Sequence, residues 1–197
     1  MKKIVLLIAL SLVLTGCGSA ESSLAAASSS VSETTAPQHI ESVEAFYGGL
    51  PSLAENSMAV FEGKVNKSHA EYINDVTGAI VNESSTNVDA PNIVIYTVYD
   101  VTVTKAYKGA AKESTDVQVK MLGDGERLIS DNAVYIDEGG EYLFFTNYKE
   151  TDLSLPMWTP NQMQGFYTRQ GDSFVPVDEK QNSLSFTISE LEAQLAV

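Results

Sequence analysis

Cysteine is almost missing from this chain: Cys17 is the only one among 197 residues. A lone cysteine excludes a disulfide within the chain. With only two histidines beside it, His39 and His69, it cannot supply the nitrogen and sulfur ligands of a zinc site at the usual spacing. A Gly-x-Ser-x-Gly nucleophile elbow and a glycine-rich phosphate loop are also missing. The sequence therefore predicts no activated nucleophile and no cofactor.

Basic residues are scarce as well, with 12 lysines and arginines against 26 aspartates and glutamates and a net charge of −14. Binding to nucleic acid and electrostatic binding to anionic lipid both need basic patches, so we expect neither. The surplus of acid indicates either a well-solvated surface or a surface that binds cations. Hydrophobic residues make up 44% of the chain, which is enough to bury the core of one domain.

The N-terminal residues have the layout of a secretory signal. Two lysines precede a largely apolar run over residues 4–14, and the run ends in Leu14, Thr15, Gly16 and Cys17. These four residues resemble the lipobox of bacterial lipoproteins. The resemblance implies that Cys17 is lipidated, becomes the mature N-terminus and anchors the protein in the cell membrane through two or three acyl chains.

Two other interpretations of this segment stay open. The apolar run could be an uncleaved anchor, although it is shorter than the ~20 residues that a spanning helix needs. Cys17 could also be a free thiol behind an ordinary secretory cleavage site, which is unusual in an exported protein. No second hydrophobic segment is present after it. We expect a signal peptide over residues 1–16, a lipidated cysteine with a disordered Ser/Ala/Thr tether over 17–41, and one β-rich domain over 42–197.

Removal of residues 1–16 takes away two of the 12 basic residues and none of the 26 acidic ones, which leaves a net charge of 10 − 26 = −16. The remainder of the chain is thus more acidic than the whole.

Alternating apolar residues predict strands through much of the domain. The patterned runs cover residues 58–68, with a bulge expected at Gly63, and residues 92–107, 116–122 and 141–148. The run 92–107 is too long for a flat strand and is expected to bend around a barrel. The run 141–148 is apolar on both faces, which predicts a central strand covered on both sides.

A hairpin is expected where residues 165–168 and 173–177 flank Gln170, Gly171 and Asp172. The sequence from Gly171 to Phe174 also resembles the nucleophile block of GDS-type esterases. That chemistry needs a histidine downstream, and both histidines lie upstream, so a turn is the favoured interpretation.

Short helical pieces are expected at the ends of the domain. Residues 42–47 and 53–55 favour helix, with breaks at Gly48, Gly49 and Pro51. At the C-terminus, Ser189 and Glu192 are spaced as a capping box that opens a helix through residue 195. The fold class predicted is mainly β, a small antiparallel OB-like barrel with short flanking helices, one of them at the C-terminus. A β-sandwich is the alternative.

Four segments together resemble a group of secreted and lipid-anchored domains of Gram-positive bacteria with an OB-like barrel, related in shape to netrin and metalloproteinase-inhibitor modules. They read MAVFEGKV at residues 58–65, AYKG at 106–109, GGEYLFF at 139–145 and QGFY at 164–167. The resemblance covers about residues 43–197 and implies a fold and a surface location, not a reaction. Inhibition through an N-terminal cysteine and disulfides is not expected, because Cys17 has no partner.

The only tryptophan, Trp158, follows Met157 in a loop flanked by prolines. Aromatic side chains on rigid loops commonly contact ligands, so both residues are candidate ligand contacts. The other interpretation is that Trp158 closes one end of the core. The loops over residues 74–91 and 155–164 are the expected contact surfaces.

Acidic residues in the loops offer candidates for metal binding and for catalysis. Asp124, Glu126 and Asp131 are weak candidates for a calcium site, although their spacing does not match an EF-hand. Asp131 with Glu138 or Glu141 could form the carboxylate pair of a hydrolase. The favoured function is a lipid-anchored, extracytoplasmic, non-catalytic binding module. We expect it to be a monomer that binds an extracellular protein or envelope polymer. An envelope-polymer hydrolase and a calcium-stabilised adhesion domain are the alternatives.

Overall fold

The computed structural model describes residues 36–81 and 92–196. The predicted signal peptide, the lipobox with Cys17, most of the tether and residues 82–91 of the first contact loop lie outside the described residues, so those predictions stay predictions. Residues Thr35–Val197 cluster by their contacts as one compact unit.

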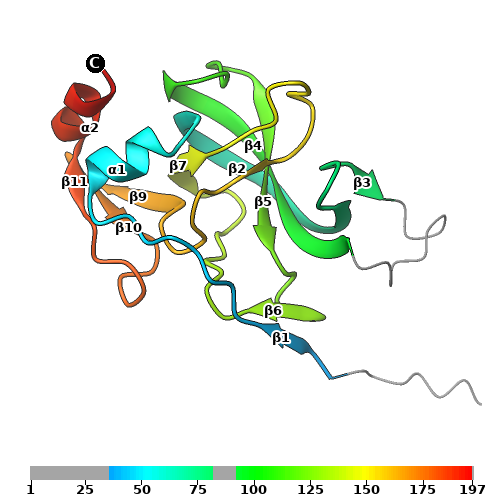
Figure 1. The fold of residues 1–197 in the computed structure, drawn as a ribbon. Helices are drawn as coiled ribbons and strands as arrows, with labels where there is room; N and C mark the ends of the chain where they lie inside the picture. Colours follow the sequence, from blue (N-terminus) through cyan, green and yellow to red (C-terminus); the bar gives the residue numbers. More distant parts are fainter. Residues whose placement is uncertain (1–35, 82–91, 197) are drawn as a thin grey trace, which may run out of the picture. The chain divides into compact units, whose positions relative to one another are not determined.

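Within these described residues, nine strands form one mostly antiparallel sheet, with β5 and β8 as its parallel pair (Figure 1). The order is β11-β10-β9-β7-β2-β4-β5-β8, and β3 pairs with β2 off this path. The bounds are β2 Ala59–Asn74, β3 Ile80–Val81, β4 Ile93–Lys108, β5 Asp116–Leu122, β7 Glu141–Thr146, β8 Met157–Trp158, β9 Phe166–Gln170, β10 Ser173–Pro176 and β11 Phe186–Thr187. A separate parallel pair joins β1 (Gln38–Ile40) to β6 (Leu128–Ser130). The prediction of a mainly β protein is confirmed.

The two longest strands, β2 and β4, curl the sheet into half a barrel. Each has 16 residues, and their pairing shifts register at three places, one of them between Glu62 and Gly63. A Cβ at Gly63 would lie 2.5 Å from Cγ1 of Val101 on β4, so only glycine fits there. The predicted bulge at Gly63 is therefore confirmed, as is the long strand after residue 92.

An antiparallel β-bridge joins the two ends of the curled series of strands, β7 and β8. Asn147, the first residue after β7, exchanges backbone hydrogen bonds with Trp158 of β8 at 3.0 and 2.6 Å. Hydrogen bonds thus run from β7 through β2, β4, β5 and β8 back to the end of β7.

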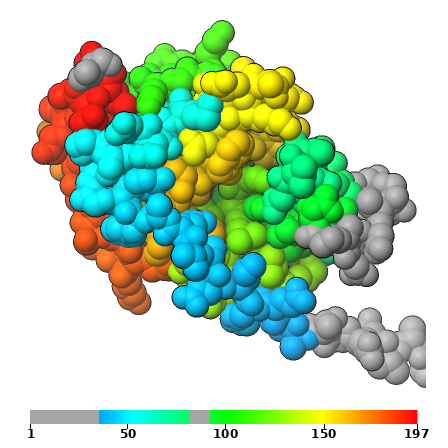
Figure 2. Space-filling view, viewed as in Figure 1, coloured from blue at the N-terminus to red at the C-terminus, as the bar shows by residue number. Residues whose placement is uncertain are grey.

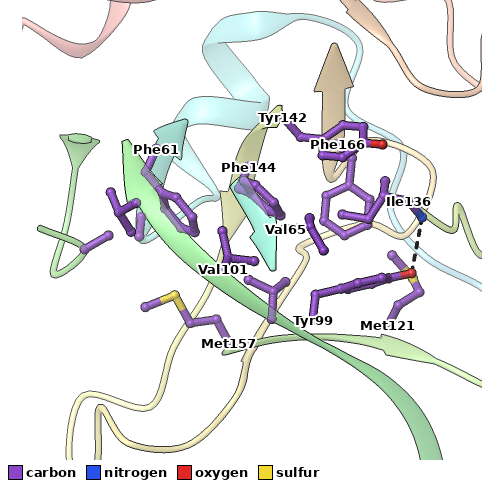
Figure 3. Close-up of a cluster of buried hydrophobic side chains, with 14 of the residues drawn as sticks. Phe61, Val65, Tyr99, Val101, Met121, Ile136, Tyr142, Phe144, Met157 and Phe166 are labelled. Carbon is purple, nitrogen blue, oxygen red and sulfur yellow. Dashed lines mark hydrogen bonds between the residues drawn. The ribbon is translucent and has the colours of Figure 1, made fainter. Parts of the chain in front are cut away.

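Strand β7 separates two apolar clusters, as its pattern predicts. Tyr142 and Phe144 face the first cluster, inside the curl, where Phe144 stacks on Phe61 at 5.0 Å between ring centroids (Figure 3). Leu143 and Phe145 face the second cluster, which also takes side chains from both helices. Burial of both faces of one strand lets a single segment stabilise two cores.

Two short helices lie side by side at one end of the unit. They are α1 (Leu50–Glu55) and the C-terminal α2 (Ile188–Leu195), so the predicted helix at the C-terminus is confirmed. Its predicted cap is wrong by two residues: the capping box joins Thr187 to Glu190, not Ser189 to Glu192. Thr187 ends β11 with extended backbone, which is the geometry that an N-cap needs.

Two other local predictions of helix differ from the structure. Pro51 lies in the first turn of α1, where its missing N–H costs nothing, so it opens the helix and does not break it. Residues 42–47 form no helix, because their backbone is hydrogen-bonded to side chains of a distant loop. The hairpin between β9 and β10 is confirmed, with Gly171 at φ +62° in its turn.

Candidate functional site

An open cleft of about 500 Å³ lies on one side of the curled sheet (Figure 2). Figure 2 shows it as the hollow between the N-terminal stretch, in blue, the segment after β7, in yellow to orange, and the turn after β2, in green. Its lining is formed by Glu44, Asp75, Val76, Thr77, Gly78, Tyr96, Lys120, Met121, Leu122, Lys149, Leu155, Pro156, Trp158, Thr159 and Gln162. The described parts of both predicted contact loops, 74–91 and 155–164, therefore meet at this cleft.

Trp158 presents its indole to the cleft from a fixed backbone. Its strand β8 is paired to Lys120 of β5 on one side and bridged to Asn147 on the other. The residue is 39% exposed, a large fraction for a tryptophan held on both sides. Met157 is only 3% exposed and packs in the first cluster. Of the two predicted contacts, Trp158 lines the cleft, whereas Met157 is buried in the first cluster.

One end of the cleft is an ion-pair and aromatic network around Asp75. The Tyr96 hydroxyl donates to Asp75 Oδ1 at 2.5 Å, and Lys120 Nζ lies 3.6 Å from the same oxygen and 4.1 Å from the centre of the Tyr96 ring. Burial, with the hydrogen bond to Asp75, raises the pKa of Tyr96 far above its usual value, so the phenol stays a neutral donor. Burial lowers the pKa of Lys120, and Asp75 opposes this effect.

The same end is closed by the turn that follows β2, residues 75–78, which we call the hairpin tip. Asn74 Oδ1 accepts from the backbone N–H groups of Val76 and Thr77, both at 3.0 Å. Lys149 Nζ donates to the Thr77 carbonyl at 2.9 Å. Because both lysines of the cleft contact the hairpin tip, their charges are concentrated at this end.

The opposite wall is the extended segment over residues 42–47, which we call the strap. The buried amide side chains of Asn161 and Gln164 bind its backbone. Gln164 accepts from the Tyr47 N–H at 2.8 Å and donates to the Tyr47 carbonyl at 2.9 Å. Asn161 donates to the Ala45 carbonyl at 2.8 Å. Gln164 and Asn161 are fully buried, so their bonds to the strap are protected from water.

Glu44 is the strap residue that lines the cleft. Its Oε2 accepts from the Gln162 backbone N–H at 2.5 Å, and its Oε1 accepts from Gln162 Nε2 at 2.8 Å. Gln162 is itself fixed, because its Oε1 accepts from Ser130 and its Nε2 also donates to Ser42 Oγ. Among residues 36–81 and 92–196, no lysine, arginine or histidine forms an ion pair with Glu44.

The weak metal candidates lie apart from the cleft lining. Asp124 Oδ1 accepts from the backbone N–H groups of residues 126, 127 and 128, and its Oδ2 accepts from Arg127 Nε at 2.8 Å. Burial would raise the pKa of Asp124, but these hydrogen bonds outweigh it and lower the pKa to about 2. Glu126 donates only its backbone N–H to this turn, and Asp131 pairs with His39 at 3.1 Å. Within the described ranges no three histidine, cysteine or acidic side chains are grouped to hold a metal ion.

The carboxylates considered for a hydrolase pair contact different elements. Asp131 contacts His39 of β1, whereas Glu138 accepts from the backbone and hydroxyl of Ser68 on β2. Those bonds lower the pKa of Glu138. Glu141 begins β7 opposite Lys64. The two carboxylates that line the cleft, Asp75 and Glu44, are different ones.

Sequence reasoning missed Glu44, Tyr96 and Lys120. Tyr96 and Lys120 lie on predicted strands as ordinary alternating positions, and Glu44 lies in a predicted helix. A weak signal exists in the residues 161–164, Asn-Gln-Met-Gln, because clustered amides in a loop need partners once they are buried.

Neither of the described helices is long and apolar enough to cross a membrane. No protein-family model matches the chain, and no curated protein matches it either.

Proposed function

We propose that this chain is a lipid-anchored, non-catalytic binding module on the outer face of the cell membrane, and that its ligand occupies the cleft beside Trp158. The ligand is an extracellular protein or an envelope polymer. The observation that carries the proposal is the cleft itself, which has an exposed indole on a fixed strand and polar side chains held in place around it. Pockets of 300–1,000 Å³ with a few fixed polar groups are typical of ligand sites.

The strand connections support an OB-like barrel for this module. A barrel of that type has five strands, and the ring here is β7, β2, β4, β5 and β8, with the bridge at Asn147 joining its ends. Ligands of such barrels bind on the face of the second and third strands and on the loops that follow the first and the fourth. In this ring those parts are β4 and β5, the loop that begins with the hairpin tip, and the loop between β7 and β8.

The cleft is lined from those same four parts, through Tyr96, Lys120, Asp75 and Lys149. A fold alone does not select a ligand, so the proposal depends on the cleft and not on the barrel. The non-catalytic assignment rests on the sequence, which has no activated nucleophile, and the two carboxylates of the lining, Asp75 and Glu44, accept hydrogen bonds from Tyr96 and Gln162.

The membrane anchor is proposed from the sequence. The apolar run and Leu14 to Cys17 support a lipidated N-terminus, and the described chain starts shortly before β1 and the strap. A Cys17→Ala variant is expected to lose membrane association, as measured by fractionation of cells that express it. Retention of that variant in the membrane fraction would contradict the anchor.

Photo-crosslinking on intact cells tests the binding site. A photoreactive residue replaces Val76, which is 77% exposed at the edge of the cleft, and in a matched control it replaces Lys180, an exposed residue outside the cleft lining. Crosslinked products are expected from position 76 and not from position 180. The same products from both positions, or none from position 76, would overturn the cleft as the binding site.

A further inference from the structure

The charges of the cleft are separated between its two ends. At the hairpin tip, Lys120 is paired with Asp75 and Lys149 donates to the Thr77 carbonyl. At the strap, Glu44 has no cationic partner among the described residues. The cleft therefore has one end where positive charge is already engaged and another where a negative charge has only amide donors.

The Glu44 carboxylate is held rigidly by those amide donors. Gln162 binds both of its oxygens, and Gln162 is buried and anchored at its other end by Ser130. A carboxylate has about four acceptor positions, and these bonds use two. The remaining acceptor capacity belongs to a side chain that lines the cleft. A fixed acceptor of this kind binds a donor without a large loss of side-chain entropy.

Two more features favour a positively charged donor. The indole of Trp158 lines the same cleft and is exposed, and tryptophan is the aromatic residue that attracts cations most strongly through its ring face. The chain as a whole carries a net charge of −14, which raises the local concentration of cations and disfavours polyanions.

We infer that the ligand places a cationic amino group on the Glu44 carboxylate at the strap end of the cleft that Trp158 also lines. This inference rests on the proposed function and deepens it by naming the chemistry of the ligand. The ammonium donates to a free acceptor position of Glu44, and the rest of the ligand extends along the cleft, past Trp158, toward the hairpin tip. The strap is then part of the binding site, because it supplies the charge.

The test uses Trp158 as the reporter, since it is the only tryptophan in the chain and its fluorescence reports on the cleft alone. The full-length protein is titrated with tri-lysine, with the same peptide acetylated on its α-amino group and on every side-chain nitrogen, and with N-acetylated tri-glutamate. Tri-lysine is expected to change the fluorescence with saturation. The acetylated peptide and tri-glutamate are expected to bind at least about tenfold more weakly, the factor that loss of one charge-assisted hydrogen bond produces.

A matched pair of variants locates the charge. Glu44→Gln removes the charge in the cleft, and Glu41→Gln removes the same charge from an exposed position three residues earlier that does not line the cleft. Glu44→Gln is expected to weaken tri-lysine binding about tenfold or more, and Glu41→Gln less than about twofold. Equal effects of the two variants would mean a diffuse attraction to the acidic protein and would overturn the inference.

Two controls keep the outcomes separable. Hydrogen exchange of the Tyr47 amide, which donates to Gln164, reports whether the strap stays bound in Glu44→Gln. If the strap detaches in Glu44→Gln, the inference is tested by the binding of tri-lysine and of its acetylated form to the unchanged protein. Equal affinities of the two peptides would overturn the inference. If position 76 gives crosslinked products but tri-lysine and its acetylated form bind equally, the inference fails and the proposed function stands. If position 76 gives no products and the two peptides bind equally, the proposed function fails as well.

Discussion

The half-barrel of strands β2, β4, β5, β7 and β8, called the barrel below, and the strap are held in place by different kinds of interaction. The barrel is held by buried apolar side chains, such as the stacked pair Phe61 and Phe144. The strap is held chiefly by buried amides: its apolar residues Val43 and Phe46 are 100% and 53% exposed, and Tyr47 at its end packs against the second cluster. Burial of apolar area stabilises the barrel without a demand for exact partners, whereas every amide at the strap needs its partner to be present. The difference indicates that apolar packing stabilises the barrel, whereas hydrogen bonds hold the strap, which forms one wall of the cleft.

The largest expected effect lies in the barrel. Phe144→Ala should lower the free energy of unfolding by about 3–5 kcal/mol, since it removes a fully buried ring that also contacts Phe166 at 5.4 Å. Phe46→Ala on the strap is the matched control and should change it by less than about 0.5 kcal/mol. Denaturant unfolding of both variants measures the contrast. Comparable losses would mean that Phe46 is buried in solution and that the comparison is wrong.

The stability that Asp124 contributes beside β1 should depend on pH. Asp124 shapes the turn whose Arg127 carbonyl accepts from Gln38 at the start of β1. Because the folded-state pKa is about 2, below its ordinary value near 3.8, its contribution is fully present above pH ~4 and is lost as the pH falls through about 2. The shift corresponds to about 2 kcal/mol.

The difference in unfolding free energy between the unchanged protein and Asp124→Asn, measured from pH 6 to pH 2, isolates this residue from the other carboxylates. The difference should shrink toward acid pH. A difference that stays constant over this range would show that the Asp124 hydrogen bonds contribute nothing through its charge.

The smallest expected effect is local to the strap. Gln164→Ala leaves the Tyr47 N–H and carbonyl without their partner, which should lower the free energy of local opening there by about 1–3 kcal/mol. Gln170→Ala, at the exposed end of β9, is the control and should have no such effect. Hydrogen exchange of the Tyr47 amide measures the opening. Equal loss of protection throughout the barrel would show that strap and barrel unfold together.

The parts of the fold that sequence could predict are those with strong local periodicity. The alternation over residues 92–107 and the doubly apolar run at 141–148 correspond to β4 and β7, because side chains of a strand alternate regardless of what surrounds it. The short strands β8 and β11 have two residues each and carry no periodic signal. They form because neighbouring strands offer free backbone groups.

The candidate site shows the same division. Trp158 was a candidate from its residue type and its setting between prolines, and the two contact loops were predicted as ranges. Glu44 could not be predicted, since its function depends on Gln162, more than a hundred residues later in the chain. The helix predicted over 42–47 also failed for that reason: its backbone groups find better-placed partners in Asn161 and Gln164 than in their own turn.

The sequence by itself determined the strongly acidic charge, the strand-rich class and the secretory pattern that ends in Cys17, because each depends on composition or local order. Only the tertiary structure decided which residues share the cleft, because Glu44, Tyr96, Lys120 and Trp158 come from four separate segments. It also decided which charges are compensated: Lys120 lies beside Asp75, and within the described ranges Glu44 accepts only from the amides of Gln162. Distance in space, and not order along the chain, sets the strength of an electrostatic interaction.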